Sequence, residues 1–164
     1  MMELYLLRHG IAEEGSAGQS DATRALTADG KRKLKSVLKT ALKADVEPSL
    51  ILTSPYKRAV QTAEIATEVL NYKGELLQTD VLIPGSTPVN VWDEVRVHRD
   101  ESQLLLAGHD PLFTDLVGYL LGFPNLRIDF KKGALLRIDF DTFSAEPRGT
   151  LKWMLVPKLT GNAP

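Results

Sequence analysis

Three short apolar runs, separated by segments with helical periodicity, constrain the fold of this chain more than any other feature. The runs cover residues 3–7, 50–53 and 103–107, and each reads as a buried strand. Between the first two runs, residues 27–45 carry apolar side chains at helical spacing. Strands that alternate with helices predict an α/β domain with a mostly parallel sheet.

The other segments extend this pattern. Ser54-Pro55 and Asp110-Pro111 each predict an N-cap with proline at the first helical position, for helices that continue to Leu70 and Leu121. Residues 76–82 are expected to be extended, residues 88–99 a polar helix, and residues 134–140 and 150–156 a hairpin. We therefore predict one domain, 1–164, folded as a three-layer α/β/α sandwich with a mixed sheet. Five aromatic residues in apolar settings are expected in its core: Phe113, Phe123, Phe130, Phe140 and Trp153.

Composition narrows the classes of function. The 164 residues contain 20 Lys and Arg against 21 Asp and Glu, so the formal charge of -1 argues against a nucleic-acid binder. The absence of cysteine excludes disulfides, thiolate metal sites and cysteine nucleophiles. The first residues lack the basic start of a signal peptide, and no apolar stretch approaches membrane-spanning length. A cytoplasmic protein without a membrane partner is the expectation.

The ends of the three predicted strands carry unusual residues. The first ends on Arg8, His9 and Gly10, the second leads through Ser54-Pro55 to Arg58, and the third ends on Gly108 and His109. Parallel strands bind ligands outside their carboxyl ends, so these side chains are expected at one edge of the sheet. Imidazole can carry a phosphoryl group and guanidinium pairs with phosphate oxygens. The set favours phosphoryl transfer through a phosphohistidine, without a cofactor.

Other interpretations of the same residues stay open. A lone histidine at a strand end is often structural, and Arg58 alone could be a solvated helix residue. A metal site would need more ligands than two distant histidines and Asp110 supply. His98 has charged neighbours and is expected at the surface. Lysines recur every fourth residue as a stripe that is either a solvated helix face or a docking surface for an acidic protein: Lys31, Lys35, Lys39 and Lys43.

Taken together, three blocks resemble the histidine phosphatase superfamily, which has the phosphoglycerate mutase-like fold. "LYLLRHG" at 4–10 resembles its Arg-His-Gly motif, "LTSPYKRAVQTAE" at 52–64 its second block, and "LLLAGHDP" at 104–111 its third. "RALTADGKRK" at 24–33 is similar to a segment of the short bacterial phosphohistidine phosphatases, whose small size also matches. The resemblance covers residues 3 to about 121.

The resemblance implies roles for individual residues. His9 would be the nucleophile, and Arg8, Arg58 and His109 would bind the phosphoryl group, with Arg24 as a fourth. Gly10 would let the backbone turn close to the phosphate. Many relatives also carry a glutamate proton donor between the second and third blocks, where this chain has Ile83 and Pro84 instead. The sequence does not choose among four substitutes for that acid: Asp80, Glu13, Glu14 and Asp21.

The function expected from the resemblance is a cofactor-independent phosphohistidine phosphatase. Its substrate would be a phosphorylated signalling or phosphocarrier protein, such as a histidine phosphotransfer domain. Two alternatives are a small-molecule phosphomonoesterase on the same scaffold and a catalytically weak phosphoprotein-binding module. The sequence leaves the partner protein and the oligomeric state open.

Overall fold

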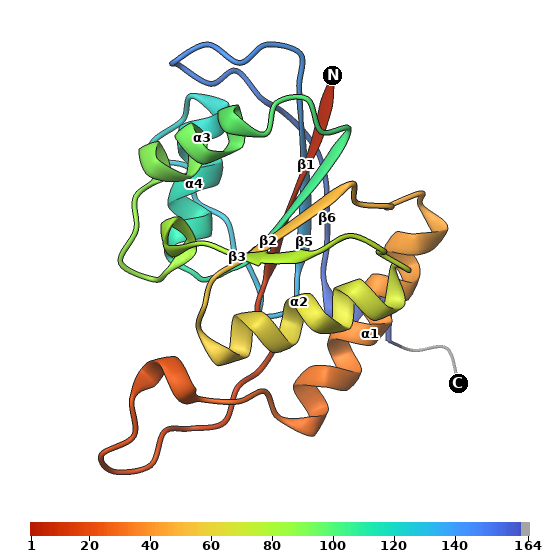
Figure 1. The fold of residues 1–164 in the computed structure, drawn as a ribbon, viewed down its shortest axis with the longest axis vertical. Helices are drawn as coiled ribbons and strands as arrows, with labels where there is room; N and C mark the ends of the chain where they lie inside the picture. Colours follow the sequence, from red (N-terminus) through yellow and green to blue (C-terminus); the bar gives the residue numbers. More distant parts are fainter. Residues whose placement is uncertain (162–164) are drawn as a thin grey trace.

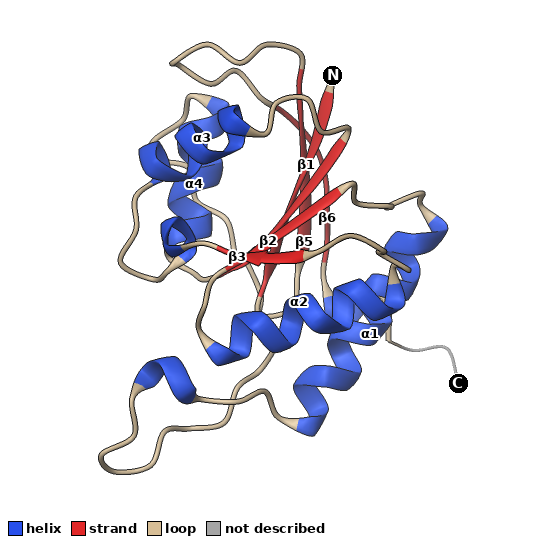
Figure 2. Ribbon diagram, viewed as in Figure 1, coloured by secondary structure: helices blue, strands red, loops and turns tan. Residues whose placement is uncertain are grey.

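The computed structural model describes residues 1–161 and has a six-stranded mixed sheet between two layers of helices (Figures 1 and 2). In their order across the sheet the strands are β3 (Leu76–Gln78), β2 (Leu50–Thr53), β4 (Gln103–Gly108), β1 (Met2–Arg8), β5 (Leu135–Phe140) and β6 (Thr150–Leu155). The first four are parallel, whereas β5 is antiparallel to both β1 and β6. This arrangement confirms the predicted three-layer sandwich and its terminal hairpin.

Two helices cover each face of the sheet (Figure 2). One pair is α1 (Ala28–Lys43) and α2 (Lys57–Val69), and the other is α3 (Pro88–Val97) and α4 (Leu112–Leu121). Three short 3₁₀ helices lie in the connections: η1 (Asp21–Thr23), η2 (Asp80–Leu82) and η3 (Pro157–Leu159). None of the helices in residues 1–161 is long and apolar enough to cross a membrane.

The middle residues of the central strands β1 and β4 are apolar because both faces of these strands are buried. In β1, Leu4 and Leu6 pack into the core under α3 and α4, whereas Tyr5 and Leu7 pack into the core under α1 and α2. All four side chains are fully buried. A strand buried on both sides gains stability from every side chain, so its sequence shows no polar alternation.

The helix starts differ in part from the prediction. Thr27 caps α1 as its side chain accepts a hydrogen bond from the amide of Gly30 at 2.9 Å. The prediction for α2 was wrong, because this helix begins at Lys57 and its N-cap is Tyr56 rather than Ser54. In α4, Pro111 takes the cap position, but the Asp110 carboxylate still accepts from the Thr114 amide at 2.9 Å.

Two further expectations needed correction. Residues 76–82 are extended only as far as Gln78, after which the chain turns into η2. Phe113, Phe130 and Phe140 are buried and Trp153 is half-buried, but Phe123 is 67% exposed. Gly122 ends α4 in the left-handed conformation, with φ of 76°, and this turns Phe123 out of the helix and away from the core.

Candidate active site

The carboxyl ends of β1, β2 and β4 lie side by side, as the topology of a parallel sheet requires. Arg8 pairs with Gly108 and Thr53 with Ala107 in the strand register. The next residues stay aligned, because the His9 amide donates to the Gly108 carbonyl at 2.9 Å and the Ser54 amide to the Ala107 carbonyl at 3.0 Å. His9, Ser54 and His109 therefore leave the sheet as neighbours.

His9 is buried and held in one tautomer. Its Nδ1 lies 2.7 Å from the Gly10 carbonyl, which can only accept, so Nδ1 carries the proton and Nε2 keeps its lone pair. Nε2 lies 3.4 Å from Nε of Arg58. Burial lowers the pKa of His9 to about 4; the bond to Gly10 opposes this shift, and the charges of Arg58, Arg8 and Lys132 add to it. The imidazole is thus neutral at pH 7, as a nucleophile must be.

Gly10 is required here by packing as well as by chemistry. A Cβ at this position would lie 2.7 Å from Leu34 Cδ1 and 3.2 Å from the Gly30 carbonyl, so α1 could not approach β1 as closely. The Gly10 amide donates to the Thr62 hydroxyl at 3.2 Å, and its carbonyl accepts from His9. The amide and the carbonyl of Gly10 both form hydrogen bonds within the protein. Gly10 therefore affects a bound phosphate by orienting the His9 ring.

Arg58 lies in the first turn of α2, with its side chain 6% exposed. Its two terminal nitrogens donate to Asp21, at 2.8 Å to the carbonyl and 3.1 Å to the carboxylate. Arg24 also donates to the Asp21 carboxylate, at 2.9 Å, and to the Glu13 carbonyl at 3.3 Å. Within residues 1–161, Arg24 makes no direct hydrogen bond to either imidazole and joins the site through Asp21.

His109 is almost fully buried beside His9, with 5.2 Å between the ring centroids. Its Nε2 lies 2.8 Å from the hydroxyl of Ser54, and that oxygen already accepts from the Tyr56 amide at 3.2 Å. We assign the ring proton to Nδ1, because the Ser54 hydroxyl still has its own proton to donate to Nε2. Burial lowers the pKa of His109 to about 3; a proton on His9 would add to this shift, as do the charges of Arg58 and Arg8, and Asp21 opposes it.

Two buried polar atoms at this edge have no hydrogen-bond partner within residues 1–161: Nδ1 of His109 and Nε of Arg8. The Arg8 guanidinium donates through Nη1 to the Phe130 carbonyl. Burial lowers the pKa of Arg8, while Asp110 and Asp129 act against that shift. Buried donors in native proteins are nearly always paired, so unpaired donors beside a neutral nucleophile indicate a place for an acceptor such as an oxyanion.

Comparison with known proteins shows the family of the chain. The family model of the histidine phosphatase superfamily (branch 1) matches residues 4–81. An uncharacterized protein of Picosynechococcus sp. is 34% identical over an alignment of 116 residues that covers 67% of this chain and 67% of that relative. The chain belongs to the histidine phosphatase superfamily.

Relatives within the superfamily extend the match to nearly the whole chain. The phosphohistidine phosphatase SixA of Escherichia coli is 26% identical over 162 residues, covering 95% of this chain and 94% of that protein. A structure of the protein histidine phosphatase SixA complexed with tungstate superposes with a TM-score of 0.86 at 26% identity, covering 96% of this chain and 99% of that one. These matches confirm the resemblance to the short bacterial phosphohistidine phosphatases.

The proton donor that many superfamily members carry has no clear replacement here. The side chains of Glu13, Glu14 and Asp80 are exposed and form no hydrogen bond or ion pair with the imidazoles within residues 1–161. Asp21 is nearer, through Arg58. Partial burial would raise the pKa of Asp21, but the hydrogen bonds and charges of Arg58 and Arg24 outweigh this effect and hold the pKa below its usual range. Asp21 is therefore a carboxylate at pH 7 and a poor acid.

Lys132 is a site residue that the sequence analysis missed. It precedes β5, which runs antiparallel to β1 and so begins at the edge where β1 ends. The Gly133 amide donates to the His9 carbonyl at 3.0 Å, which fixes this turn against the site, and the charge of Lys132 contributes to the lowered pKa of His9. The only sequence signal was its position before a strand whose partner was unknown.

No group of three or more His, Asp or Glu side chains in residues 1–161 is arranged to hold a metal ion. The side chains nearest His9 and His109 include the cations Arg8 and Arg58, which suit an anion instead.

Proposed function

We propose that this protein is a phosphohistidine phosphatase that acts on a phosphorylated protein through a covalent phosphohistidine on His9. The observation that carries the proposal is a buried, neutral His9 whose Nδ1 is tied to Gly10 and whose Nε2 faces Arg58. The likeness to SixA over nearly the whole chain supports the same assignment.

In the first step, Nε2 of His9 attacks the phosphorus of the bound phosphohistidine. The bond from Nε2 to phosphorus forms, the phosphorus–nitrogen bond of the substrate breaks, and the released imidazole leaves with a proton it gained from solvent. Arg8, Arg58 and Nδ1–H of His109 donate to the phosphoryl oxygens as charge develops on them. The Gly10 carbonyl stabilises the positive charge on the phosphorylated ring through Nδ1–H.

In the second step, a water molecule attacks the phosphorus of the phosphoenzyme. The bond to Nε2 breaks, the water oxygen becomes the fourth oxygen of inorganic phosphate, and its proton passes to phosphate or solvent. His9 returns to its neutral Nδ1–H tautomer. In neither step does the proposal need a metal or an organic cofactor, because the arginines supply the positive charge and the neutral His109 donates a hydrogen bond.

The missing acid fits this class of substrate. An alkyl phosphate expels an alkoxide, which needs a proton in the transition state. A phosphohistidine can take its proton from solvent, because imidazole titrates near pH 6.5, and it then leaves as a neutral ring. A histidine phosphotransfer domain or a phosphocarrier protein is the kind of substrate that we propose.

The test is a panel of steady-state rates on a phosphohistidine protein, a sugar phosphate and an aryl phosphate, each measured before and after exhaustive chelation. We expect the highest kcat/KM on the phosphoprotein, no loss on chelation, and inhibition by tungstate. A sugar phosphate as the best substrate would favour a small-molecule phosphomonoesterase. Binding of the phosphoprotein without turnover would favour a binding module, and activity restored by Zn²⁺ or Mn²⁺ would show a metal enzyme.

A further inference from the structure

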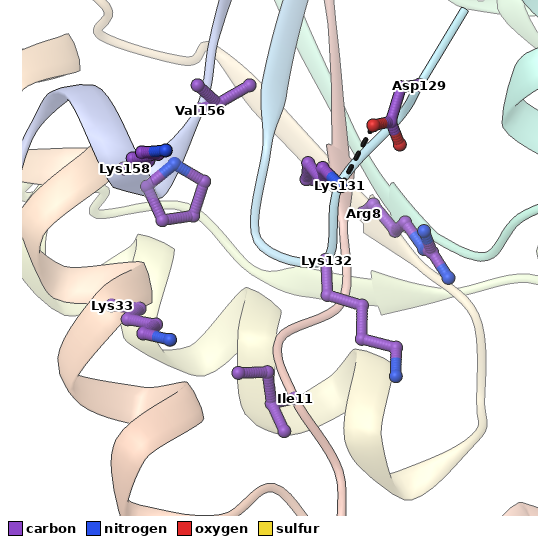
Figure 3. Close-up of a pocket in the computed structure, with 9 residues that line it drawn as sticks. Arg8, Ile11, Lys33, Asp129, Lys131, Lys132, Val156 and Lys158 are labelled. Atoms are coloured by element: carbon purple, nitrogen blue, oxygen red, sulfur yellow. Dashed lines mark ion pairs between the residues drawn. The ribbon is translucent and has the colours of Figure 1, made fainter.

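A cationic cavity adjoins the active site, and the proposed chemistry leaves most of it unused (Figure 3). It has a volume of about 720 Å³ and opens to solvent. Its charged lining consists of five cations and one carboxylate: Arg8, Lys33, Lys131, Lys132, Lys158 and Asp129. We call this the cationic cavity. The side chains come from β1, α1, η3 and the turn before β5, so segments distant in the sequence build one charged surface.

The cavity keeps an excess of positive charge after its internal ion pairs are considered. Lys131 pairs with Asp129 at 2.8 Å, and Lys33 pairs with Asp29 of α1 at 3.2 Å. Lys132 and Lys158 form no ion pair within residues 1–161. A concave surface with unpaired cations attracts anionic ligands.

The cavity is also larger and more apolar than a phosphate site. Ile11, Val156 and Pro157 contribute apolar surface between the lysines. Its volume lies in the range of about 300–1,000 Å³ typical of pockets that enclose organic ligands. The surface therefore suits an anionic group carried on an organic framework, such as an acidic side chain of a protein, rather than an inorganic ion.

The cavity and the nucleophile are contiguous. Arg8 directly precedes His9 and lines the cavity, and Ile11 follows two residues after His9. Lys132 also lines the cavity, and its charge helps to lower the pKa of His9. A group held in the cavity can thus belong to the molecule whose phosphoryl group lies at His9.

We propose that the cationic cavity binds an acidic segment flanking the phosphohistidine of the protein substrate, with its Asp or Glu side chains against Lys33, Lys132 and Lys158. This inference rests on the proposed function and specifies its substrate class. It also separates two faces of α1. Lys33 faces the cavity, whereas the stripe formed by Lys31, Lys35, Lys39 and Lys43 is exposed and does not line it.

The test compares two phosphohistidine peptides that differ only in flanking residues, Asp and Glu in one and Asn and Gln in the other. Exposed ion pairs change an equilibrium by about 1.5- to 5-fold each, so wild type should prefer the acidic peptide by about tenfold in kcat/KM. The double variant Lys33→Gln/Lys158→Gln should reduce this preference to about threefold. The matched control, Lys35→Gln/Lys39→Gln, removes the same charge from α1 outside the cavity and should keep the wild-type preference.

Each alternative result has a distinct meaning. Equal rates on the two peptides in wild type would overturn the inference and leave the proposed function standing. An equal loss of preference in the control variant would assign docking to the lysine stripe, which also overturns it. So would a small bisphosphate hydrolysed faster than the acidic peptide, because the cavity would then bind a second phosphate.

Two further measurements protect the test. The wild-type preference for the acidic peptide should fall towards one at high ionic strength. This measurement uses wild-type protein only, so it does not depend on the folding of a variant. A preference that salt does not change would contradict the inference. Phosphoramidate, which has no flanking residues, serves as the third substrate. If neither peptide nor phosphoramidate is hydrolysed, it is the proposed function that has failed.

Discussion

Two regions meet at the carboxyl edge of the sheet and differ in how far their titratable side chains are exposed to water. In the imidazole pocket, formed by His9, Ser54, Arg58 and His109, burial lowers the pKa of both histidines, to about 4 and about 3. In the cationic cavity, the lysines are solvated; the side chain of Lys33 is 43% exposed and that of Lys131 is 63% exposed. A buried polar group that loses its hydrogen-bond partner costs far more free energy than the loss of an exposed ion pair. Substitutions should therefore have large effects in the pocket and graded effects in the cavity.

The strongest way to break this comparison is His9→Ala. No other imidazole nitrogen in residues 1–161 is hydrogen-bonded to an arginine, so kcat should fall on the order of 10³-fold or more. Denaturing wild type during turnover should trap a phosphoenzyme that is stable in alkali and labile in acid. Residual turnover within tenfold of wild type, or a phosphoenzyme in the variant, would exclude His9 as the nucleophile.

The next largest effect concerns the leaving group. If no acid serves the site, a phosphohistidine peptide should exceed a phosphoserine peptide of the same sequence by on the order of 100-fold in kcat/KM, the lower end of what a general acid contributes. The common sequence keeps contacts in the cationic cavity equal for both. Comparable rates would mean that an acid is present, and the amide variants of Asp21, Asp80, Glu13 and Glu14 would identify it.

How much of this site can be predicted from sequence depends on which strands build it. The convergence of His9 and His109 follows from two apolar runs and the rule that parallel strands share a carboxyl edge. Lys132 could not be found in this way, because its position depends on β5 pairing with β1, and a hairpin pattern does not reveal which strand it joins.

Ser54 shows a second limit. Ser-Pro before a helix is a strong local signal for an N-cap, yet the hydroxyl of Ser54 is within hydrogen-bond distance of His109, 55 residues later in the chain. A contact between distant segments thus gave the residue a different role from the local prediction. The prediction that Phe123 lies in the core was wrong for the opposite reason. The local turn at Gly122 directs Phe123 to solvent although its neighbours in the sequence are apolar.

The pH dependence of stability measures how far the two histidines are kept neutral. Their folded pKa values lie below the unfolded value of about 6.5, so the unfolded chain binds more protons as the pH falls. The stabilisation is fully present above pH 6.5 and should be lost towards pH 4, by up to about 1.4 kcal/mol per pH unit for each histidine.

Carboxylates titrate in the same range, so the measurement needs a pair of variants. Urea unfolding between pH 6.5 and pH 4.5 should give a smaller loss of stability in His109→Asn than in wild type. The matched control is His98→Asn, which removes a half-buried histidine at the C-terminal cap of α3, outside the active site. Equal slopes for wild type and His109→Asn would mean that His109 is not held neutral by burial.

The smallest effect expected in the imidazole pocket is that of Ser54→Ala, which tests the tautomer of His109. The hydroxyl of Ser54 is the partner of Nε2, at 2.8 Å, and without it the proton is no longer directed to Nδ1. A hydrogen bond of this kind is worth about 0.5–1.5 kcal/mol, so the affinity for tungstate should fall about two- to tenfold while His9 remains competent. Nitrogen NMR of His109 should show the Nε2–H tautomer gaining population, a change that a general loss of packing would not produce.

Thr53→Val is the matched control, because it removes the adjacent buried hydroxyl, whose bond is to the Ser54 carbonyl rather than to an imidazole. If Ser54→Ala and Thr53→Val weaken tungstate binding equally and leave the tautomer of His109 unchanged, Ser54 has only a packing role. If only Ser54→Ala shifts the tautomer, the serine of the Ser-Pro turn positions the second histidine of the site.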